Sequence, residues 1–207
     1  MKYSKKKYLD YMVRTIEALR DAPNNNHVFI NNPGFGNIFD ILKNDNYRSR
    51  FYEALTSYVD EEYTETIIDS LKKSSFNSFF SPAPLIRAIT EYLPSIPNFK
   101  PKNILEPSAG NGLIIRGLLK EFPEANVTAF EKEILTTRIL EHNFKNKPNV
   151  TAFGIPFEAI GTSTAPKKYD LVISNIPFGA NKVFDPDLME HPLKSELTSN
   201  IHSYFIY

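Results

Sequence analysis

Two short polar motifs stand out because each follows an apolar run that has the pattern of a buried strand. The first is LEPSAGNG, residues 105–112, which also opens the helical pattern GLIIRGLLKEF. The second is SNIPFG, residues 174–179, which ends the run YDLVI. In α/β sheets, ligands bind at the carboxyl ends of the strands. The two motifs are therefore predicted to lie opposite one another at one site.

The first motif has the features of a loop that binds a nucleotide-like ligand. Gly110 and Gly112 let the backbone approach a ligand closely, and N–H groups at the start of the following helix face the crevice. Glu131 ends the next strand pattern, about twenty residues after Gly112, a spacing that suits a carboxylate bound to ribose hydroxyls. The alternative is a tight turn without a ligand, against which the two carboxylates, Glu106 and Glu131, argue.

The cofactor predicted for this loop is S-adenosylmethionine rather than a dinucleotide. The third glycine of the dinucleotide fingerprint would fall at Ile115, whose side chain blocks close packing of the helix. Glu106, at the tip of the preceding strand, would repel a pyrophosphate but attract a cation. S-adenosylmethionine has a ribose, no phosphate, a sulfonium and an ammonium group.

The elements that position these motifs fall into two parts. Residues 1–75 read as a helical domain, with helical patterns near Tyr8–Leu19, Tyr47–Val59 and Tyr63–Leu71 and a loop at NNNHVFINNPGFGN. Residues 76–207 read as the N-terminal part of a methyltransferase-type domain, opening with Ser81 as a helix cap. There, strand patterns (NILEPS, NVTAFE, NVTAF, YDLVIS) alternate with the helical patterns GLIIRGLLKEF and ILTTRILEHNF.

This alternation predicts an α/β fold: a Rossmann-like sheet of about four parallel strands preceded by a helical N-terminal domain. The last ten residues, TSNIHSYFIY, begin a helical pattern and stop within it. A short terminal helix packed on the sheet is one interpretation. We favour the other, an incomplete sheet in the front part of a longer protein, because doubly wound sheets normally continue past four strands.

Composition excludes several classes of function. Lys plus Arg equals Asp plus Glu, 24 of each, which argues against a surface dedicated to coating nucleic acid. There is no cysteine, and the four histidines lack ligand spacing, so no disulfide, thiolate zinc site or other metal site is expected. The basic N-terminus lacks an apolar signal core, and no stretch is long enough to span a membrane. We expect a cytoplasmic protein.

Taken in order, four segments resemble a known family: FFSP (79–82), EPSAGNG (106–112), FE (130–131) and NIPF (175–178). The chain resembles the S-adenosylmethionine-dependent DNA methyltransferases that make N6-methyladenine. It is similar to methylase subunits of type I restriction systems and to the front of mobile-element methylase-helicase proteins. The resemblance covers roughly residues 76–184 and implies DNA as partner, with further domains or subunits completing the sheet and reading the target.

The resemblance implies a role for each matching residue. The cofactor would be bound by Phe80 and Ser81 at its methionine end, by Glu131 at its ribose, and by the loop residues Glu106, Ser108, Gly110 and Gly112. The catalytic residues would be Asn175, Ile176, Pro177 and Phe178, with the Asn175 side chain and Ile176 carbonyl accepting the two hydrogens of the adenine amine. Phe178 would stack on a target base taken out of the duplex.

Two departures from the family pattern leave alternatives open. Ile176 replaces the first proline of the catalytic motif, although a backbone carbonyl is all that this position contributes. The segment after residue 153 lacks the usual acidic residue, so Phe157 would flank the cofactor's adenine and Glu158 would bind its amine. The alternatives are methylation of a protein glutamine amide or of ribosomal RNA, a non-catalytic methyltransferase-fold module, and, for SNIPFG, a simple turn with a packed aromatic.

Overall fold

The computed structural model describes residues 4–21, 35, 38–74, 81–157, 159, 168–176, 189–190, 196, 199 and 205. The N-terminal part of the chain forms helices α1 (Lys5–Asp21), α3 (Ile38–Leu42), α4 (Asp45–Thr56) and α5 (Glu61–Ser74). The remainder alternates between helices and strands: α6 (Ala83–Tyr92), η1 (Leu93–Ser95), β1 (Asn103–Glu106), α7 (Leu113–Glu121), β2 (Asn126–Phe130), α8 (Ile134–Phe144), β3 (Val150–Phe153) and β4 (Leu171–Val172).

The four strands form one parallel sheet in the order β3-β2-β1-β4. The chain thus winds outward from β1 to β3 and then returns to the other side of β1 with β4. This confirms the predicted Rossmann-like α/β fold. The register pairs Glu106 at the end of β1 with Ala129 of β2, so the carboxyl ends of both strands reach the same edge of the sheet.

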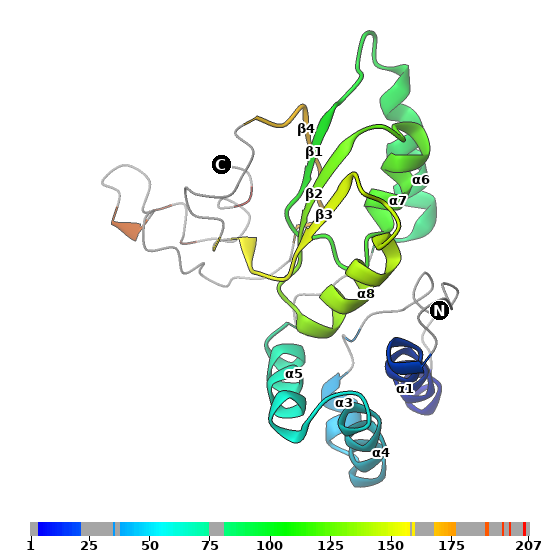
Figure 1. The fold of residues 1–207 in the computed structure, drawn as a ribbon, viewed down its shortest axis with the longest axis vertical. Helices are drawn as coiled ribbons and strands as arrows, with labels where there is room; N and C mark the ends of the chain where they lie inside the picture. The colour runs from blue at the N-terminus through cyan, green and yellow to red at the C-terminus, as the bar shows by residue number, and fades with distance from the viewer. Residues whose placement is uncertain are drawn as a thin grey trace.

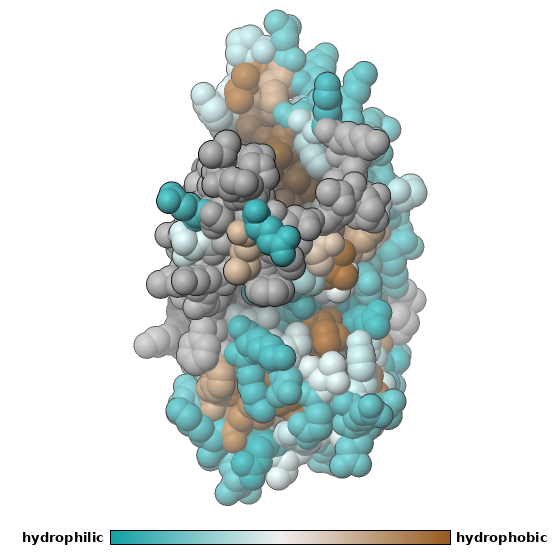
Figure 2. All heavy atoms as spheres, turned by 90° about the vertical axis from the view of Figure 1, so that its left-hand side faces the viewer, coloured by the Kyte–Doolittle hydropathy of each residue, from teal (hydrophilic) through white to brown (hydrophobic). Residues whose placement is uncertain are grey.

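Helices α6, α7 and α8 lie on the same side of the sheet (Figure 1). Apolar side chains from β1 and β2 pack there against α7 and α8 and form the core of the α/β part: Ile104, Ala109, Ile115, Leu118, Ala125, Val127, Ala129, Leu140 and Phe144. The opposite face of the sheet is turned toward the viewer in Figure 2, where apolar atoms are visible in the upper half. Val172 of β4 is 56% exposed.

The N-terminal helices enclose a core of their own, and α8 joins it to the sheet. Leu9, Met12 and Ile16 recur on one side of α1 and are fully buried with residues of α3, α4 and α5. Leu135 and Ile139 of α8 also belong to this core, while Leu140 of the same helix faces the sheet core. The helix is therefore apolar on two sides and is the structural link between the helical part and the sheet.

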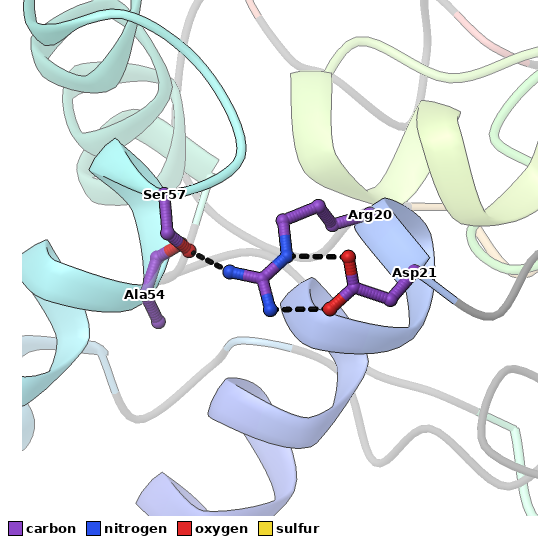
Figure 3. A network of polar contacts seen from close by, with 4 residues as sticks. All are labelled: Arg20, Asp21, Ala54 and Ser57. Atoms are coloured by element: carbon purple, nitrogen blue, oxygen red, sulfur yellow. Dashed lines mark hydrogen bonds and ion pairs between the residues drawn. The ribbon is translucent and has the colours of Figure 1, made fainter.

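A network of hydrogen bonds connects the end of α1 to the end of α4 (Figure 3). The Arg20 guanidinium donates to the Ser57 hydroxyl at 2.7 Å and pairs with the carboxylate of Asp21. Ser57 in turn donates to the Ala54 carbonyl at 2.7 Å. These groups are exposed, so the network sets the ends of the helices against each other and adds little to stability.

The sequence predicted most element positions, with four differences. Helix α3 was not predicted, and β4 spans two residues where the pattern indicated six. Pro82, not Ser81, is the residue that precedes α6, and no side chain caps that helix. The first strand also ends at Glu106, so Pro107 and Ser108 belong to the glycine loop rather than to the strand. The predicted C-terminal helical pattern and the boundary near residue 75 lie almost wholly outside the described residues.

No helix among the described residues is long and apolar enough to cross a membrane. Within the same residues, no three acidic or histidine side chains are grouped closely enough to hold a metal ion.

We predict that Ile139→Ala destabilises the chain by about 2–5 kcal/mol, because Ile139 is 1% exposed and fills the helical core from α8. The matched control is Ile89→Ala, since Ile89 on α6 is 42% exposed, and a change within about 0.5 kcal/mol is expected there. Urea unfolding of the three proteins measures both. An equal loss of unfolding free energy in Ile139→Ala and Ile89→Ala would mean that α8 does not join the two cores.

Candidate active site

The glycine loop connects β1 to α7 at the carboxyl edge of the sheet. Its shape is held from β2, because the Ala109 N–H donates to the Phe130 carbonyl at 2.8 Å. Gly110 and Gly112 both have positive φ angles, 57° and 83°, which side chains rarely adopt. The loop thus lies where the sequence predicted it. The backbone conformation at both of its glycines is one that other residues rarely adopt.

Close packing against α8 also requires glycine at position 112. A Cβ atom at this position would lie 2.2 Å from Phe144 Cε2 and 2.9 Å from Leu140 Cδ1, both on α8. The glycine therefore allows α8 to pack closely against the start of α7. The predicted role of Gly112 in cofactor binding stays a prediction beside this packing requirement.

Glu131 follows β2 and organises the loop. Its carboxylate accepts the Gly110 N–H at 2.9 Å and the Glu133 N–H at 2.8 Å. Burial raises the pKa of Glu131, and these two backbone hydrogen bonds oppose that rise. A carboxylate has about four acceptor positions, so two remain for the hydroxyls of a ribose.

Glu106, at the tip of β1, is buried without compensation. Its side chain is 0% exposed, and neither carboxyl oxygen makes a hydrogen bond of normal geometry with a described residue. Burial raises the pKa of Glu106 to about 8; the Ser174 hydroxyl and the Ser108 N–H favour the charged form, and Glu131 disfavours it. Such a group is stabilised as a carboxylate only when a cation comes close.

A third buried carboxyl, Glu133, was missed by sequence reasoning. It is the N-cap of α8 and accepts the N–H groups of Leu135 at 3.0 Å and Thr136 at 2.6 Å, together with the Thr136 hydroxyl at 2.6 Å. Burial raises the pKa of Glu133 to about 7, with Glu131 contributing in the same direction. The signal was its place directly before a helical pattern, but caps are usually shorter side chains.

The end of β4 is joined to the glycine loop by Ser108. The Ser108 hydroxyl donates to the Asn175 carbonyl at 3.1 Å, and its oxygen lies 2.6 Å from the Ser174 hydroxyl oxygen. The Ile173 N–H donates to the Leu105 carbonyl at 3.0 Å, which continues the β1–β4 pairing to this point. The two polar motifs of the sequence therefore meet at one edge of the sheet.

Of the remaining predicted site residues, the structure describes three, Phe157, Ser81 and Ile176. Phe157 packs edge-on against Phe130, with ring centres 6.0 Å apart, and stacks on Phe205 at 5.2 Å. It thus stands beside the end of β2, next to Glu131. Ser81 lies just ahead of α6, and Ile176 follows Asn175 beyond β4. Phe80, Glu158, Pro177 and Phe178 lie outside the described residues.

Comparison with known proteins assigns the family. The model of the methyltransferase small domain matches residues 77–196, more than half of the chain. The chain belongs to this methyltransferase family. The resemblance predicted from its motifs is confirmed in its broad form.

Individual relatives agree with this assignment. The type II methyltransferase M.AccI of Acinetobacter calcoaceticus is 28% identical over 120 residues, 58% of this chain and 21% of that enzyme. A modification subunit ascribed to a type I restriction enzyme of Vibrio vulnificus superposes with a TM-score of 0.50 at 12% identity, over 78% of this chain and 37% of the subunit. A class I S-adenosylmethionine-dependent methyltransferase of Listeria monocytogenes gives 0.52 at 15% identity, over 97% and 68%.

The two structures share the fold with this chain, an S-adenosylmethionine-dependent methyltransferase fold. The chain spans about a fifth of the length of M.AccI and just over a third of that of the modification subunit.

We predict that Glu106→Gln changes the pH dependence of stability. Because the pKa of Glu106 is raised to about 8, the folded chain keeps a proton that the unfolded chain loses above its ordinary value of 4.5. The free energy of unfolding therefore falls as pH rises from about 4.5 to about 8. Gln cannot ionise, so the melting temperature of the variant relative to that of the unchanged chain should rise between about pH 4.5 and pH 8 and level off above pH 8.

The control is Glu124→Gln, since Glu124 is an exposed carboxylate on the same domain. Its melting temperature should follow that of the unchanged chain at every pH. A constant difference between Glu106→Gln and the unchanged chain would contradict the account of a neutral, buried carboxyl.

A second prediction concerns Gly112. Gly112→Ala should destabilise the chain by more than about 1 kcal/mol, because alanine is strained at a φ of 83° and its Cβ would overlap Phe144. In a Phe144→Leu background the added cost should shrink to that of backbone strain alone. A double-mutant cycle by chemical unfolding measures the coupling, and independent effects would mean that Phe144 does not occupy the space at Gly112.

Proposed function

We propose that this chain is part of an S-adenosylmethionine-dependent methyltransferase that methylates the exocyclic N6 of adenine in DNA. The observation that carries the proposal is the hydrogen-bonded contact of Ser108 with Ser174 and Asn175. It joins a cofactor-type glycine loop to an Asn-Ile-Pro-Phe strand end. Either motif alone occurs in many proteins, whereas their meeting at one edge of a methyltransferase sheet is specific.

The residues that face the loop suit this cofactor. Glu106 is a buried carboxyl with no ion pair and no hydrogen bond of normal geometry among the described residues, which fits the ammonium or sulfonium of S-adenosylmethionine. Glu131 has acceptor positions left for the ribose and is already fixed by Gly110 and Glu133. Phe157, beside Phe130, would offer an aromatic wall to the adenine.

The catalytic step needs little more than orientation. S-adenosylmethionine supplies an electrophilic methyl group on a sulfonium that leaves as a neutral thioether. An adenine amine is a poor nucleophile because its lone pair is delocalised into the ring. We infer that the Asn175 side-chain oxygen and the Ile176 carbonyl accept its two hydrogens and draw the nitrogen toward a tetrahedral geometry. The nitrogen then forms the bond to carbon, and one of its hydrogens leaves as a proton to solvent.

Ser108 has a defined part in this proposal. Because its hydroxyl holds the Asn175 carbonyl, the main chain at residue 175 is fixed relative to the cofactor loop. The neighbouring Ile176 carbonyl is not the one that Ser108 binds. Replacement of the family's proline by Ile176 therefore leaves the proposed acceptor in place, and Pro177 would still favour an extended Ile176.

DNA is the proposed substrate because the relatives are named as a type II methyltransferase and as the modification subunit of a type I restriction enzyme. The net formal charge of zero favours local engagement over a broad basic surface. Phe178 would stack on the extruded base, and segments that complete the sheet and read the target would come from the rest of the protein or from partner subunits.

We predict that the chain binds S-adenosylhomocysteine and not NAD, with Glu131→Ala weakening the affinity by about 1–3 kcal/mol through loss of the ribose acceptor. Calorimetric titration measures this, and thermal unfolding without ligand separates a binding defect from a folding defect. Glu124→Gln serves again as the control. Tight binding of NAD, or unchanged affinity in a folded Glu131→Ala variant, would contradict the cofactor assignment.

In the full-length protein, Asn175→Ala should abolish transfer of labelled methyl to unmethylated DNA while cofactor affinity stays nearly unchanged. The amide contact matters mainly in the transition state, so the loss appears in turnover rather than in binding. A substrate panel of adenine-containing DNA, ribosomal RNA and a glutamine peptide identifies the acceptor. Equal incorporation by Asn175→Ala and the unchanged protein would reduce SNIPFG to a turn; transfer only to RNA or peptide would replace the substrate.

A further inference from the structure

A cavity outside the proposed cofactor site lies between α7 and α8. Its volume is about 310 Å³, and its apolar wall is formed by Leu113, Leu119 and Phe144. Neither Glu106 nor Glu131 lines it. Asn111 and Gly112 form its end, so the cavity touches the glycine loop from the side that faces α8.

The polar wall of this cavity is cationic. Arg116, Lys120 and Lys147 line it, and no acidic residue does. Lys120 is engaged by Glu91 at 3.7 Å and Glu121 at 3.5 Å. Among the described residues, neither the Arg116 guanidinium nor the Lys147 ammonium has an ion pair. Two positive charges therefore remain uncompensated at the cavity.

Arg116 is the more informative of the two. Partial burial lowers the pKa of its guanidinium, and no neighbouring group opposes that effect. Arg116 is nevertheless exposed at the cavity, so its guanidinium can turn toward an anion bound there. Guanidinium groups match phosphate oxygens with two parallel hydrogen bonds, and an ammonium such as Lys147 adds a point charge.

The wall of the cavity also contains Asn143, whose side-chain oxygen lacks a hydrogen bond with any described residue. The Asn143 side-chain nitrogen donates to the Asn111 carbonyl at 2.8 Å, which turns the amide toward the loop. The Asn143 amide oxygen is buried and has no hydrogen-bond partner among the described residues. A donor on a ligand could reach this acceptor after a small rotation of the side chain.

We propose that this cavity binds a phosphate monoester that carries an aromatic ring, the chemistry of a mononucleotide. The phosphate, with a charge of about −1.5 to −2 at neutral pH, matches the two uncompensated cations better than a single carboxylate does. The ring lies against Leu113, Leu119 and Phe144. The volume is at the lower end of the range for small-molecule sites, which suits one nucleotide rather than two.

The test is calorimetric titration of the chain with uridine 5′-monophosphate and with phenyl phosphate, in the presence of S-adenosylhomocysteine. A uracil or phenyl ring avoids confusion with the adenine of the cofactor. Both compounds should bind saturably at one site per chain, and uridine and benzoate should bind at least about tenfold more weakly. A 5′-phosphorylated oligonucleotide that binds as well as the mononucleotide would identify the source as a nucleic-acid end within the same chemistry.

Arg116→Gln and Lys147→Gln should each weaken binding of uridine 5′-monophosphate by about tenfold or more. Both side chains lack ion pairs with described residues, so folding should be unaffected. The control is Lys43→Gln, an exposed cation between α3 and α4, which should leave binding unchanged.

Three results would overturn the proposal. One is the absence of saturable binding by either phosphate, and another is affinity that Lys43→Gln reduces as much as Arg116→Gln does. The third is displacement of uridine 5′-monophosphate by S-adenosylhomocysteine, which would place the phosphate ester in the cofactor site. The first two outcomes leave the binding of S-adenosylhomocysteine untouched, and the third requires it, so failure of this proposal is distinguishable from failure of the proposed function.

Discussion

The burial of carboxyl groups at the carboxyl edge of the sheet is the constraint on which the rest of this structure depends. Glu106 and Glu133 are fully withdrawn from water and Glu131 is partly so, which costs free energy unless each charge is compensated. Glu133 is compensated by the first turn of α8, and Glu131 by the N–H groups of Gly110 and Glu133. Glu106 is the least compensated, because neither of its oxygens makes a hydrogen bond of normal geometry with a described residue, and only the nearby Ser174 hydroxyl and Ser108 N–H favour its charged form.

These interactions also transmit the position of α8 to the proposed site. Glu133 fixes the start of α8, and the backbone of the same residue fixes Glu131, which holds the glycine loop at Gly110. At the other end of α8, Phe144 occupies the space that a side chain at position 112 would need. Because Leu135 and Ile139 of this helix fill the core of the N-terminal helices, that part of the chain supports the loop although it carries none of the polar motifs.

Much of this arrangement could be predicted from the sequence because it follows from local patterns. The alternation of apolar runs and helical periodicity specified the sheet, and the helix predicted over residues 134–144 is α8 itself. The glycines after β1 and the carboxylates at the ends of β1 and β2 indicated a ligand site at the edge of the sheet where the structure brings these residues together. The approach of SNIPFG to that loop required only the rule that parallel strands share a carboxyl edge.

What the sequence did not predict depends on contacts between distant segments. Nothing local shows that a side chain at position 112 would meet Phe144, about thirty residues away, so this packing requirement was not predicted. Glu133 was missed because glutamate is an uncommon N-cap, and its burial depends on how α8 meets the sheet. The two-residue length of β4 could not be read from YDLVIS, since an apolar run does not show where pairing ends.

The central claim is that Glu106 is a neutral carboxyl in the free chain and becomes a carboxylate against a cationic ligand. The most direct measurement is the number of protons released when S-adenosylmethionine binds, obtained at pH 7 by calorimetry in buffers of different ionisation enthalpy. Because the pKa of Glu106 is about 8, the account predicts release of about one proton in the unchanged chain, and none attributable to this group in Glu106→Gln. Binding with no proton release, or the same release from Glu106→Gln, would contradict it.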